Sequence, residues 1–314
     1  MSGKQSGRMG RGVESSASAR SRARARSARG AAWAVILAAA WLFGNGALEA
    51  HPGVGIVMDR QGNVFYTDLA QVWKIASDGS RSIAVKNVHT HELCLDADGN
   101  LYGEHLWYEG EKIDKWGHRI WRLGADGKLV DVVPAREGFR KNYSFVRDAA
   151  GNMYWSEGDG PVEIRRRAPD GVITTQGKCA SCRGGGWMTA TPDGTVLFLD
   201  QGGLRRMGPD GASSLVAKHL ESRSLTQLQV GDRHFLMGVW TDRAGSAYVA
   251  VYGARQVKRI DSEGHVEVVA TSPPPWSPTG GLVAPNGDLW LLEYSLNNEA
   301  RVRRIRKDGS ETIF

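Results

Sequence analysis

The stretch from Asn87 to His105, NVHTHELCLDADGNLYGEH, predicts both the fold of this chain and its candidate site. Its middle, Asp96-Ala-Asp-Gly99-Asn100, is a turn signal between two short apolar runs and predicts a β-hairpin. If the turn is symmetric, residues whose numbers sum to 196 face each other, and His91 lies opposite His105. His89, two residues before His91, is expected on the same face of the same strand. Three imidazoles would then lie together at the open end of one hairpin.

The same turn recurs along the chain, which indicates an internal repeat. Six turns of the type Asp-x-x-Gly-Asn, with varied spelling, begin at Asp59, Asp96, Asp148, Thr191, Asp242 and Ala284. Each copy has a second turn, which contains Gly79, Gly127, Gly171, Gly211, Gly264 or Gly309. Between the turns lie strand-like segments such as Val72-Trp73-Lys74-Ile75. Two turns per copy mean four antiparallel strands, and six copies predict an all-β fold, a six-bladed β-propeller of four-stranded antiparallel blades.

The beginning of the chain differs in composition from the rest. Residues 1–30 hold eight basic residues and one acid, and an apolar stretch from Ala31 to Phe43 follows. That stretch is shorter than the ~20 residues of a membrane-spanning helix and precedes small residues, the pattern of a signal peptide. We predict a basic leader with a signal peptide over residues 1–50 and a propeller over residues 51–314, in an exported protein, periplasmic or secreted. An uncleaved N-terminal anchor, the one expected membrane contact, is the alternative, because Leu48 fits poorly before a cut after Ala50.

Charge argues against nucleic acid as a partner. Residues 1–50 contain eight of the 40 Lys and Arg residues and two of the 34 acids, so the rest of the chain has 32 of each. The basic sequence pI of 9.3 therefore comes from the leader, and the propeller has no basic excess with which to bind phosphates. We expect a monomer that takes a small-molecule substrate.

The three cysteines have different surroundings. Cys179-Ala-Ser-Cys182 lies in a glycine-rich segment, where, in an exported protein, a small-loop disulfide and a redox or metal-binding pair are expected equally. Cys94 stands inside an apolar strand and is expected to be a buried thiol.

Comparison of the six copies singles out the second one. The innermost strand of a propeller blade borders the central channel, and the residues eight positions before each first-turn glycine are Val54, His91, Tyr143, Gly186, Met237 and Thr279. Six positions after that glycine stand Asp68, His105, Glu157, Asp200, Val251 and Glu293. The four acids are expected to bond backbone amides of neighbouring blades or, alternatively, to line a cation-binding channel. The second copy has a histidine at both positions.

The second copy also has the longest insertion between its two turns, from Gly99 to Gly127. Loops of unusual length on repeat scaffolds often carry the binding function. We predict that four aromatic residues near this rim contact the substrate: Trp107, Tyr108, Trp187 and Trp240.

Two histidines on one strand with a third opposite are the arrangement that a three-histidine zinc, copper or iron site requires. We predict that His89, His91 and His105 bind a divalent transition metal, which lowers the pKa of bound water and polarises a carbonyl. The predicted acid and base groups are Glu104, Glu109 or Glu157 as the base and Tyr143 as the acid or orienting group. Rim histidines that bond loop backbone are the alternative. A structural calcium ion is a further expected cofactor.

The spelling of the six first turns resembles that of the NHL-repeat, SMP-30/gluconolactonase-like and streptogramin-lyase-like propellers over residues 52–314. The resemblance implies a six-bladed propeller, and because this fold hosts many activities it implies function only weakly. The gluconolactonase metal site takes acidic and amide side chains from several blades, which the residues at these positions do not match. The peptide-amidating lyases use histidines from different blades, and streptogramin lyases use a histidine base beside a metal.

We therefore expect an exported, metal-dependent hydrolase of lactonase type or a lyase, which acts on a small polar substrate at the channel rim. One alternative is a non-catalytic NHL-type envelope protein that binds or scaffolds through Trp107, Tyr108 and Trp116. The other is an oxidative enzyme that uses copper or iron.

Overall fold

The structure is a computed structural model that describes residues 52–108, 116–137, 146–157, 161–183, 186–200, 203–221 and 235–314. For residues 108, 116, 136 and 137 it describes the backbone only. The leader predicted over residues 1–50 lies outside the described residues. No helix in the described part of the chain has the length and hydropathy needed to cross a membrane.

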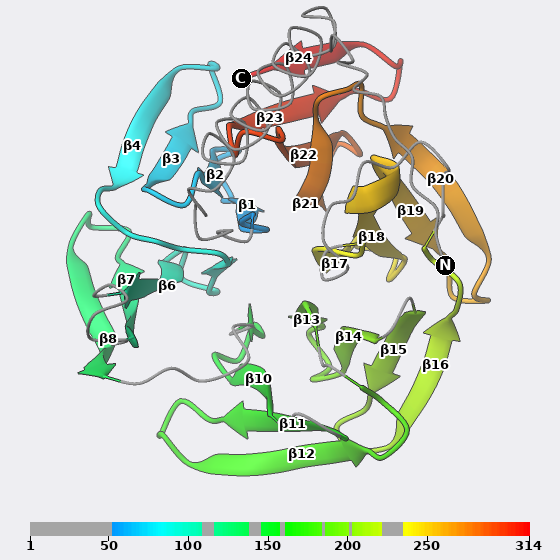
Figure 1. Ribbon diagram of the computed structural model, residues 1–314. Helices are drawn as coiled ribbons and strands as arrows, with labels where there is room; N and C mark the ends of the chain where they lie inside the picture. The colour runs from blue at the N-terminus through cyan, green and yellow to red at the C-terminus, as the bar shows by residue number, and fades with distance from the viewer. Residues whose placement is uncertain are drawn as a thin grey trace, which may run out of the picture. The chain divides into compact units, whose positions relative to one another are not determined.

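The described residues form twenty-four strands in six four-stranded antiparallel sheets, which surround a common centre as blades (Figure 1). Blades one to three consist of β1 (Ile56–Met58), β2 (Val64–Thr67), β3 (Val72–Ile75) and β4 (Arg81–Val85); β5 (Leu93–Leu95), β6 (Leu101–Tyr108), β7 (Trp116–Leu123) and β8 (Leu129–Glu137); and β9 (Val146–Arg147), β10 (Met153–Glu157), β11 (Val162–Arg167) and β12 (Ile173–Cys179). Blades four to six consist of β13 (Met188–Ala190), β14 (Val196–Asp200), β15 (Gly203–Met207) and β16 (Ser213–Ala217); β17 (Val239–Thr241), β18 (Ala247–Val251), β19 (Gln256–Ile260) and β20 (Val266–Thr271); and β21 (Ser277–Val283), β22 (Leu289–Tyr294), β23 (Ala300–Ile305) and β24 (Glu311–Ile313). The one helix among the described residues is a single 3₁₀ turn, η1 (Tyr252–Ala254). The predicted six-bladed propeller is confirmed.

The repeated turn forms because its side chains satisfy its own backbone. In blade two the Asp96 carboxylate accepts the amides of Asp98 and Asn100 at 3.0 and 2.9 Å. Its other oxygen accepts the Asn100 side-chain amide at 2.8 Å and the Tyr102 hydroxyl at 2.9 Å. Gly99 has a φ of +82°, a backbone conformation that residues with a Cβ rarely adopt. One carboxylate therefore holds a complete hairpin turn, which explains why the spelling recurs in the sequence.

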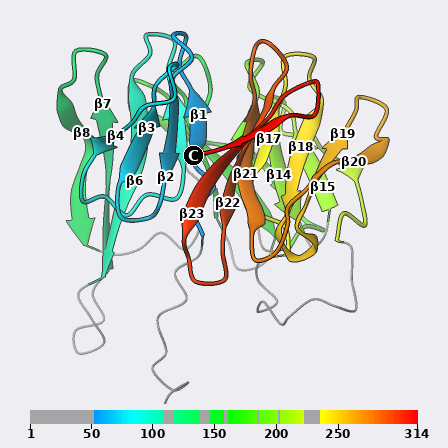
Figure 2. The same ribbon diagram turned by 90° about the horizontal axis from the view of Figure 1, so that it is seen from above.

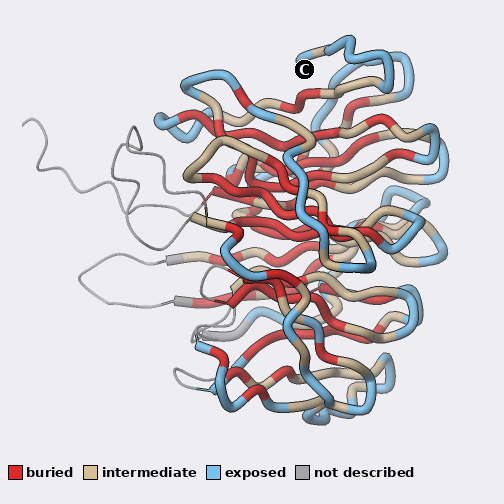
Figure 3. The backbone as a smooth tube through the Cα atoms, turned by 90° about the vertical axis from the view of Figure 1, so that its right-hand side faces the viewer, coloured by how far each residue is buried: buried red, intermediate tan, exposed pale blue. Residues whose placement is uncertain are grey.

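The hydrophobic core is divided into layers between neighbouring blades. One layer between blades one and two contains Phe65, Val72, Leu93, Leu101 and the fully buried Trp121. Similar layers lie between blades three and four, four and five, and five and six. Figure 3 shows that the buried segments run through the middle of the blades while the turns are exposed. Each blade therefore depends on its neighbours for burial of its two faces.

The ring closes between blades six and one without exchange of a strand, since β21–β24 and β1–β4 each form a complete sheet (Figures 1 and 2). The Tyr294 hydroxyl, fully buried, donates to the Thr67 carbonyl at 3.0 Å across this junction. Gly280 packs directly on the backbone of Val54, with no space for a side chain. The closure therefore depends on side-chain bonding and close backbone packing between the first and last blades.

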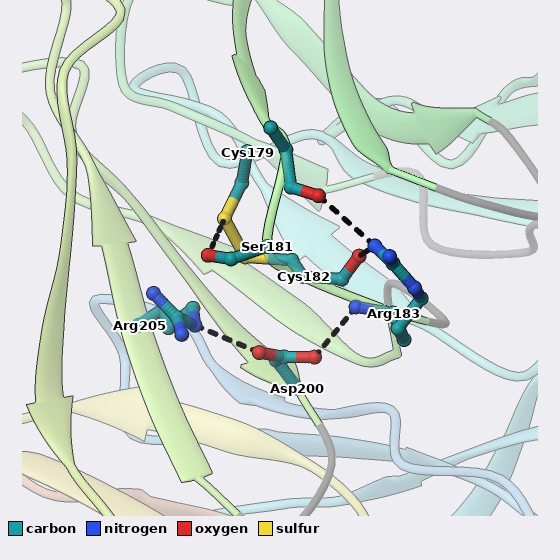
Figure 4. Close-up of a disulfide and its surroundings, with 7 residues drawn as sticks. Cys179, Ser181, Cys182, Arg183, Asp200 and Arg205 are labelled. Atoms are coloured by element: carbon teal, nitrogen blue, oxygen red, sulfur yellow. Dashed lines mark hydrogen bonds and ion pairs between the residues drawn. A yellow bond between two sulfur atoms is a disulfide. The ribbon is translucent and has the colours of Figure 1, made fainter.

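A disulfide joins Cys179, the last residue of β12, to Cys182 (Figure 4). Both residues are buried. The next residue, Arg183, donates its amide to the Asp200 carboxylate at 2.9 Å, and Asp200 also pairs with Arg205 at 2.7 Å. The disulfide thus closes a short loop at the end of blade three, and the hydrogen bond from Arg183 to Asp200 joins this segment to blade four. Of the alternatives for this cysteine pair, the disulfide is the one observed.

Candidate functional site in blade two

The hairpin of β5 and β6 has the predicted register, with Leu93 opposite Gly103 and Leu95 opposite Leu101. Each of these pairs sums to 196. The ladder begins only at Leu93, so His91 does not pair with His105 as a strand neighbour. The physical reason is that the side chain of Glu104 takes the place of the opposite strand at His91.

Glu104 replaces the ladder through its carboxylate. This group, only 2% exposed, accepts the backbone amide of His91 at 2.5 Å and that of Glu92 at 3.2 Å. The same carboxylate lies 3.5 Å from Nδ1 of His91. The Thr90 hydroxyl and the Trp121 indole both donate to the Glu104 carbonyl. Glu104 therefore holds the backbone at His91 and contacts its ring, and its predicted role as a general base stays a prediction.

The three predicted histidines do lie together, and we refer to His89, His91 and His105 as the histidine cluster. The rings of His89 and His91 are 4.8 Å apart, edge to face, at an interplanar angle of 79°. The His89 amide donates to Nδ1 of His105 at 2.9 Å. His91 is 4% exposed, while the other two are partly exposed.

Burial keeps two of these imidazoles neutral. Burial lowers the pKa of His89 to about 4, and the neighbouring His91 adds to the shift. Burial also lowers the pKa of His105, with the Arg119 guanidinium as the second cause. Because Nδ1 of His105 accepts an N–H, the proton of this neutral ring is on Nε2.

The charge of the histidine cluster suits a metal ion, because two of its imidazoles are neutral. The arrangement of its rings does not suit a metal ion. Metal ligands must be neutral imidazoles, as His89 and His105 are. However, the His89 amide occupies Nδ1 of His105. Among the residues that the structure describes, no group of three or more His, Cys, Asp or Glu side chains is arranged to hold a metal ion. The predicted three-histidine metal site therefore stays a prediction.

The predicted aromatic contacts fall into two groups. Trp107 stacks on His105, at a centroid distance of 5.9 Å, and its ring covers Gly117, where a Cβ would not fit. Trp187 and Trp240 belong to the wall of a central cavity, and the Trp187 ring lies 6.3 Å from that of His91. The side chain of Tyr108 lies outside the described residues. Trp187 thus connects the histidine cluster with the cavity.

The central cavity has a volume of about 1060 Å³, and all six innermost strands line it. It extends from the hairpin turns at one face of the ring to the first residues of the inner strands, where Glu92 and Trp187 line it. Glu92 is 4% exposed and was not predicted as a site residue. The sequence signal that could have identified Glu92 is its charged side chain directly before the apolar run Leu93 to Leu95. His118, in β7, is also buried, beside Leu106 in the strand register.

Glu157 does not join the histidine cluster in the described contacts. Glu157 is exposed at the end of β10, where it accepts the Trp155 indole at 2.9 Å and lies 3.7 Å from Arg165. Tyr143 and Glu109 lie outside the described residues.

The acids at the position equivalent to His105 hold their own blades together. Asp68 accepts the amides of Ala70 and Gln71, and Asp200 accepts the amide of Arg183. Glu293 is fully buried and pairs with Arg301 and Arg303 at 2.7 and 2.9 Å. In blade two His105 replaces this acid, and Arg119, opposite it on β7, pairs with Asp131 at 2.9 Å instead. At the position equivalent to His105, blades one, four and six therefore use a carboxylate to bond neighbouring residues. In the described contacts of blade two, the Arg119–Asp131 pair takes the place of those bonds.

Comparison with known proteins identifies structural neighbours only. No protein-family model matches the sequence, and no curated protein does. Virginiamycin B lyase from Staphylococcus aureus shares the fold with a TM-score of 0.54 and 15% identity, over 85% of each chain. A gluconolactonase from Xanthomonas campestris has a TM-score of 0.54 and 14% identity, over 78% of this chain and 83% of its own.

The calcium-binding protein regucalcin from Agrobacterium tumefaciens has a TM-score of 0.52 and 16% identity, over 78% of this chain and 84% of its own. Identities this low establish the common fold and leave activity open. The predicted resemblance is thus confirmed in structure: the chain is a six-bladed β-propeller of the architecture shared by streptogramin B lyases and gluconolactonase- or regucalcin-like proteins.

Proposed function

We propose that this protein is an exported propeller enzyme, a hydrolase or lyase, that acts on a small polar substrate at the histidine cluster. The observation that carries the proposal is the concentration of His89, His91 and His105 in one of six similar blades. The His91 ring lies 6.3 Å from that of Trp187, which lines the central cavity. A purely structural propeller needs no histidines at these positions of one blade, since acids at the position equivalent to His105 stabilise other blades.

The two partly exposed histidines suit opposite roles in proton transfer. His89 is in its base form at neutral pH, because burial lowers its pKa to about 4. His105 presents an Nε2–H, because its Nδ1 accepts the His89 amide. His89 is therefore assigned as the base, and His105 as the donor to a substrate oxygen.

Two buried residues, Glu104 and His91, hold His89 in place. Glu104 accepts the amides of His91 and Glu92, which fixes the backbone that carries His89. His91 packs edge to face on His89 and restricts its ring. Fixed positions matter because proton transfer requires hydrogen-bond reach between the base and the substrate.

The same pair serves two related reactions. In elimination, His89 removes a proton from carbon while His105 donates to the departing oxygen, and a double bond forms. In hydrolysis, His89 removes a proton from water as the water oxygen attacks the carbonyl carbon, and His105 donates to the carbonyl oxygen. The tetrahedral intermediate then returns that proton to His105, its bond to the leaving oxygen breaks, and the leaving alcohol takes the proton from His89. The names of the structural neighbours include a lyase and a gluconolactonase, which supports testing both classes.

Turnover by the purified full-length protein tests the proposal, with virginiamycin B, quinupristin, a gluconolactone and simple esters as substrates. His89→Gln and His105→Gln should each lower kcat by about 100-fold or more, the contribution of a positioned acid or base. His219→Asn is the matched control, because Asn tolerates the positive φ of 56° at that position. Activity that survives both cluster replacements would refute the assigned roles.

Metal binding by His89, His91 and His105 is the alternative to these acid and base roles, because a ring nitrogen that binds a metal neither accepts nor donates a proton. Metal analysis of the purified protein, before and after His91→Ala, measures it directly. A stoichiometric zinc, copper or iron that is lost in the variant supports the predicted three-histidine site. Metal content that is negligible, or unchanged by the replacement, contradicts that site.

Export is supported by the Cys179–Cys182 disulfide, because disulfides are rare in the cytosol and persist in oxidising compartments. Expression of the full-length chain in a bacterial host, followed by N-terminal sequencing of the periplasmic fraction, tests the predicted cut. A mature chain that begins at His51 is expected. Recovery of the chain in the cytosol with residues 1–50 attached would contradict the proposal.

A further inference from the structure

The central cavity has a second chemical feature, at the end where the hairpin turns lie. Residues of the turns and of the adjoining strand ends line it there, including Arg60, Asp78, Arg243 and Asn286. This end is separate from the first residues of the inner strands, where Trp187 approaches His91. Its chemistry does not depend on the proposed catalytic activity.

Positive groups outnumber negative ones in the cavity wall. Among the described residues, five arginines line the cavity: Arg60, Arg147, Arg243, Arg304 and Arg306. The described carboxylates that line it are three: Asp59, Asp78 and Glu92. Since the chain after residue 50 has equal numbers of basic and acidic residues, this excess is a local property of the cavity.

The carboxylates at the turns are engaged by their own backbone. Asp59 accepts the amides of Gln61 and Asn63 at 2.9 and 2.8 Å, and the Asn63 side chain at 2.7 Å. Asp78 accepts the Ser80 amide at 2.8 Å. These bonds keep both carboxylates in their turns, where they are poorly placed to neutralise guanidinium groups of other blades.

Several of the guanidinium groups have neutral partners. Arg147 lies over the Tyr102 ring at 4.1 Å and reaches the Gly151 carbonyl. Arg306 donates to the hydroxyls of Ser310 and Thr312. Arg304 is the exception, since it pairs with Asp288 at 2.6 Å. Among the described lining residues at this end of the cavity, arginines therefore outnumber carboxylates, and the excess comes from blades three, five and six.

The remaining wall is apolar and aromatic. Trp240, Trp290 and Phe314 line the cavity together with the aliphatic side chains of the inner strands. Trp290 and Phe314 stack at a centroid distance of 5.4 Å. A cavity of about 1060 Å³ is at the upper end of the usual size for small-molecule sites.

We infer that the turn end of the central cavity binds a small anionic molecule with a flat aromatic body. Its anionic group, a carboxylate or a sulfonate, pairs with the arginines at the turns, and its ring lies against the aromatic wall. A guanidinium matches such oxygens with paired N–H donors.

The test compares two probes of the same shape by isothermal titration calorimetry on the full-length protein. One is 2-naphthoate, which carries the charge, and the other is 2-naphthylmethanol, which does not. The variant is Arg60→Gln with Arg243→Gln, because both side chains are exposed and their replacement leaves the core unchanged. The matched control is Arg206→Gln, an exposed arginine outside the cavity lining.

Naphthoate should bind at least about tenfold more tightly than naphthylmethanol, the equivalent of roughly 1.4 kcal/mol. The double variant should lose about tenfold in naphthoate affinity and leave naphthylmethanol unchanged, while Arg206→Gln behaves as the wild type. Raising the salt to about 0.3 M should weaken naphthoate alone, by charge screening. Equal affinities for the two probes, no binding of naphthoate, or wild-type affinity in the double variant would overturn the inference.

Discussion

Replacement of Glu104 measures how strongly one buried side chain holds the histidine cluster in place. Its carboxylate is 2% exposed and accepts the amides of His91 and Glu92, which precede the first ladder pair of β5. Glu104→Ala removes the acceptor of these two buried amides, at about 1–3 kcal/mol each. We expect a loss of about 3 kcal/mol or more in the free energy of unfolding. Glu104→Gln retains an acceptor oxygen and loses the charge, which should cost about 1.5 kcal/mol.

Urea unfolding followed by tryptophan fluorescence measures both variants, with the unfolding free energy extrapolated linearly to water. Glu267→Ala serves as the control, because its carboxylate is 59% exposed and pairs with Arg259 at the surface. Such a pair contributes about 1 kcal/mol or less. If Glu104→Ala were as stable as Glu267→Ala, Glu104 would not hold the backbone of the cluster, and its positioning role would be refuted.

Three further predictions concern other parts of the ring. Gly280→Ala places a methyl group against the backbone of blade one at the ring closure, and should lower the unfolding free energy by about 3 kcal/mol, measured by urea unfolding. The pKa of Glu163 is lowered to about 2, first of all by its hydrogen bond with Lys178. Its stabilising contribution is therefore complete above about pH 4.5 and falls as the pH drops towards 2, so thermal unfolding of wild type and Glu163→Gln should converge over that range. Replacement of Cys179 and Cys182 by Ala should cost about 2 kcal/mol by the loop-closure relation for so short a loop, again measured by urea unfolding.

Each of these three predictions has a matched control. Gly208→Ala meets mainly the end of the Asp210 side chain, which can rotate away, and should cost much less than Gly280→Ala. A Glu263→Gln variant, altered at an exposed carboxylate, should keep the wild-type pH dependence of the melting temperature. Dithiothreitol should destabilise the wild type and leave the cysteine double variant unchanged. Equal effects of the two glycine replacements, or a dithiothreitol effect on the double variant, would contradict the respective explanation.

The sequence by itself determined the blades, because their signals are local. A turn such as Asp96 to Asn100 is completed by its own carboxylate and its own left-handed glycine. Residues at most six apart in the chain make these bonds, so the six turns and the register of the β5–β6 hairpin were readable as a pattern. The same alternation placed His89, His91 and His105 near one another.

Tertiary structure alone decided how those residues are used. Glu104 faces two amides because the β5 ladder begins only at Leu93, a detail that alternation along a strand does not encode. The wall of the central cavity and its arginines come from separate blades, which meet only when the ring closes. Strand patterns record which side of a sheet a residue faces. The distances between blades, and with them the chemistry of the cavity, are set by packing between residues far apart in the chain.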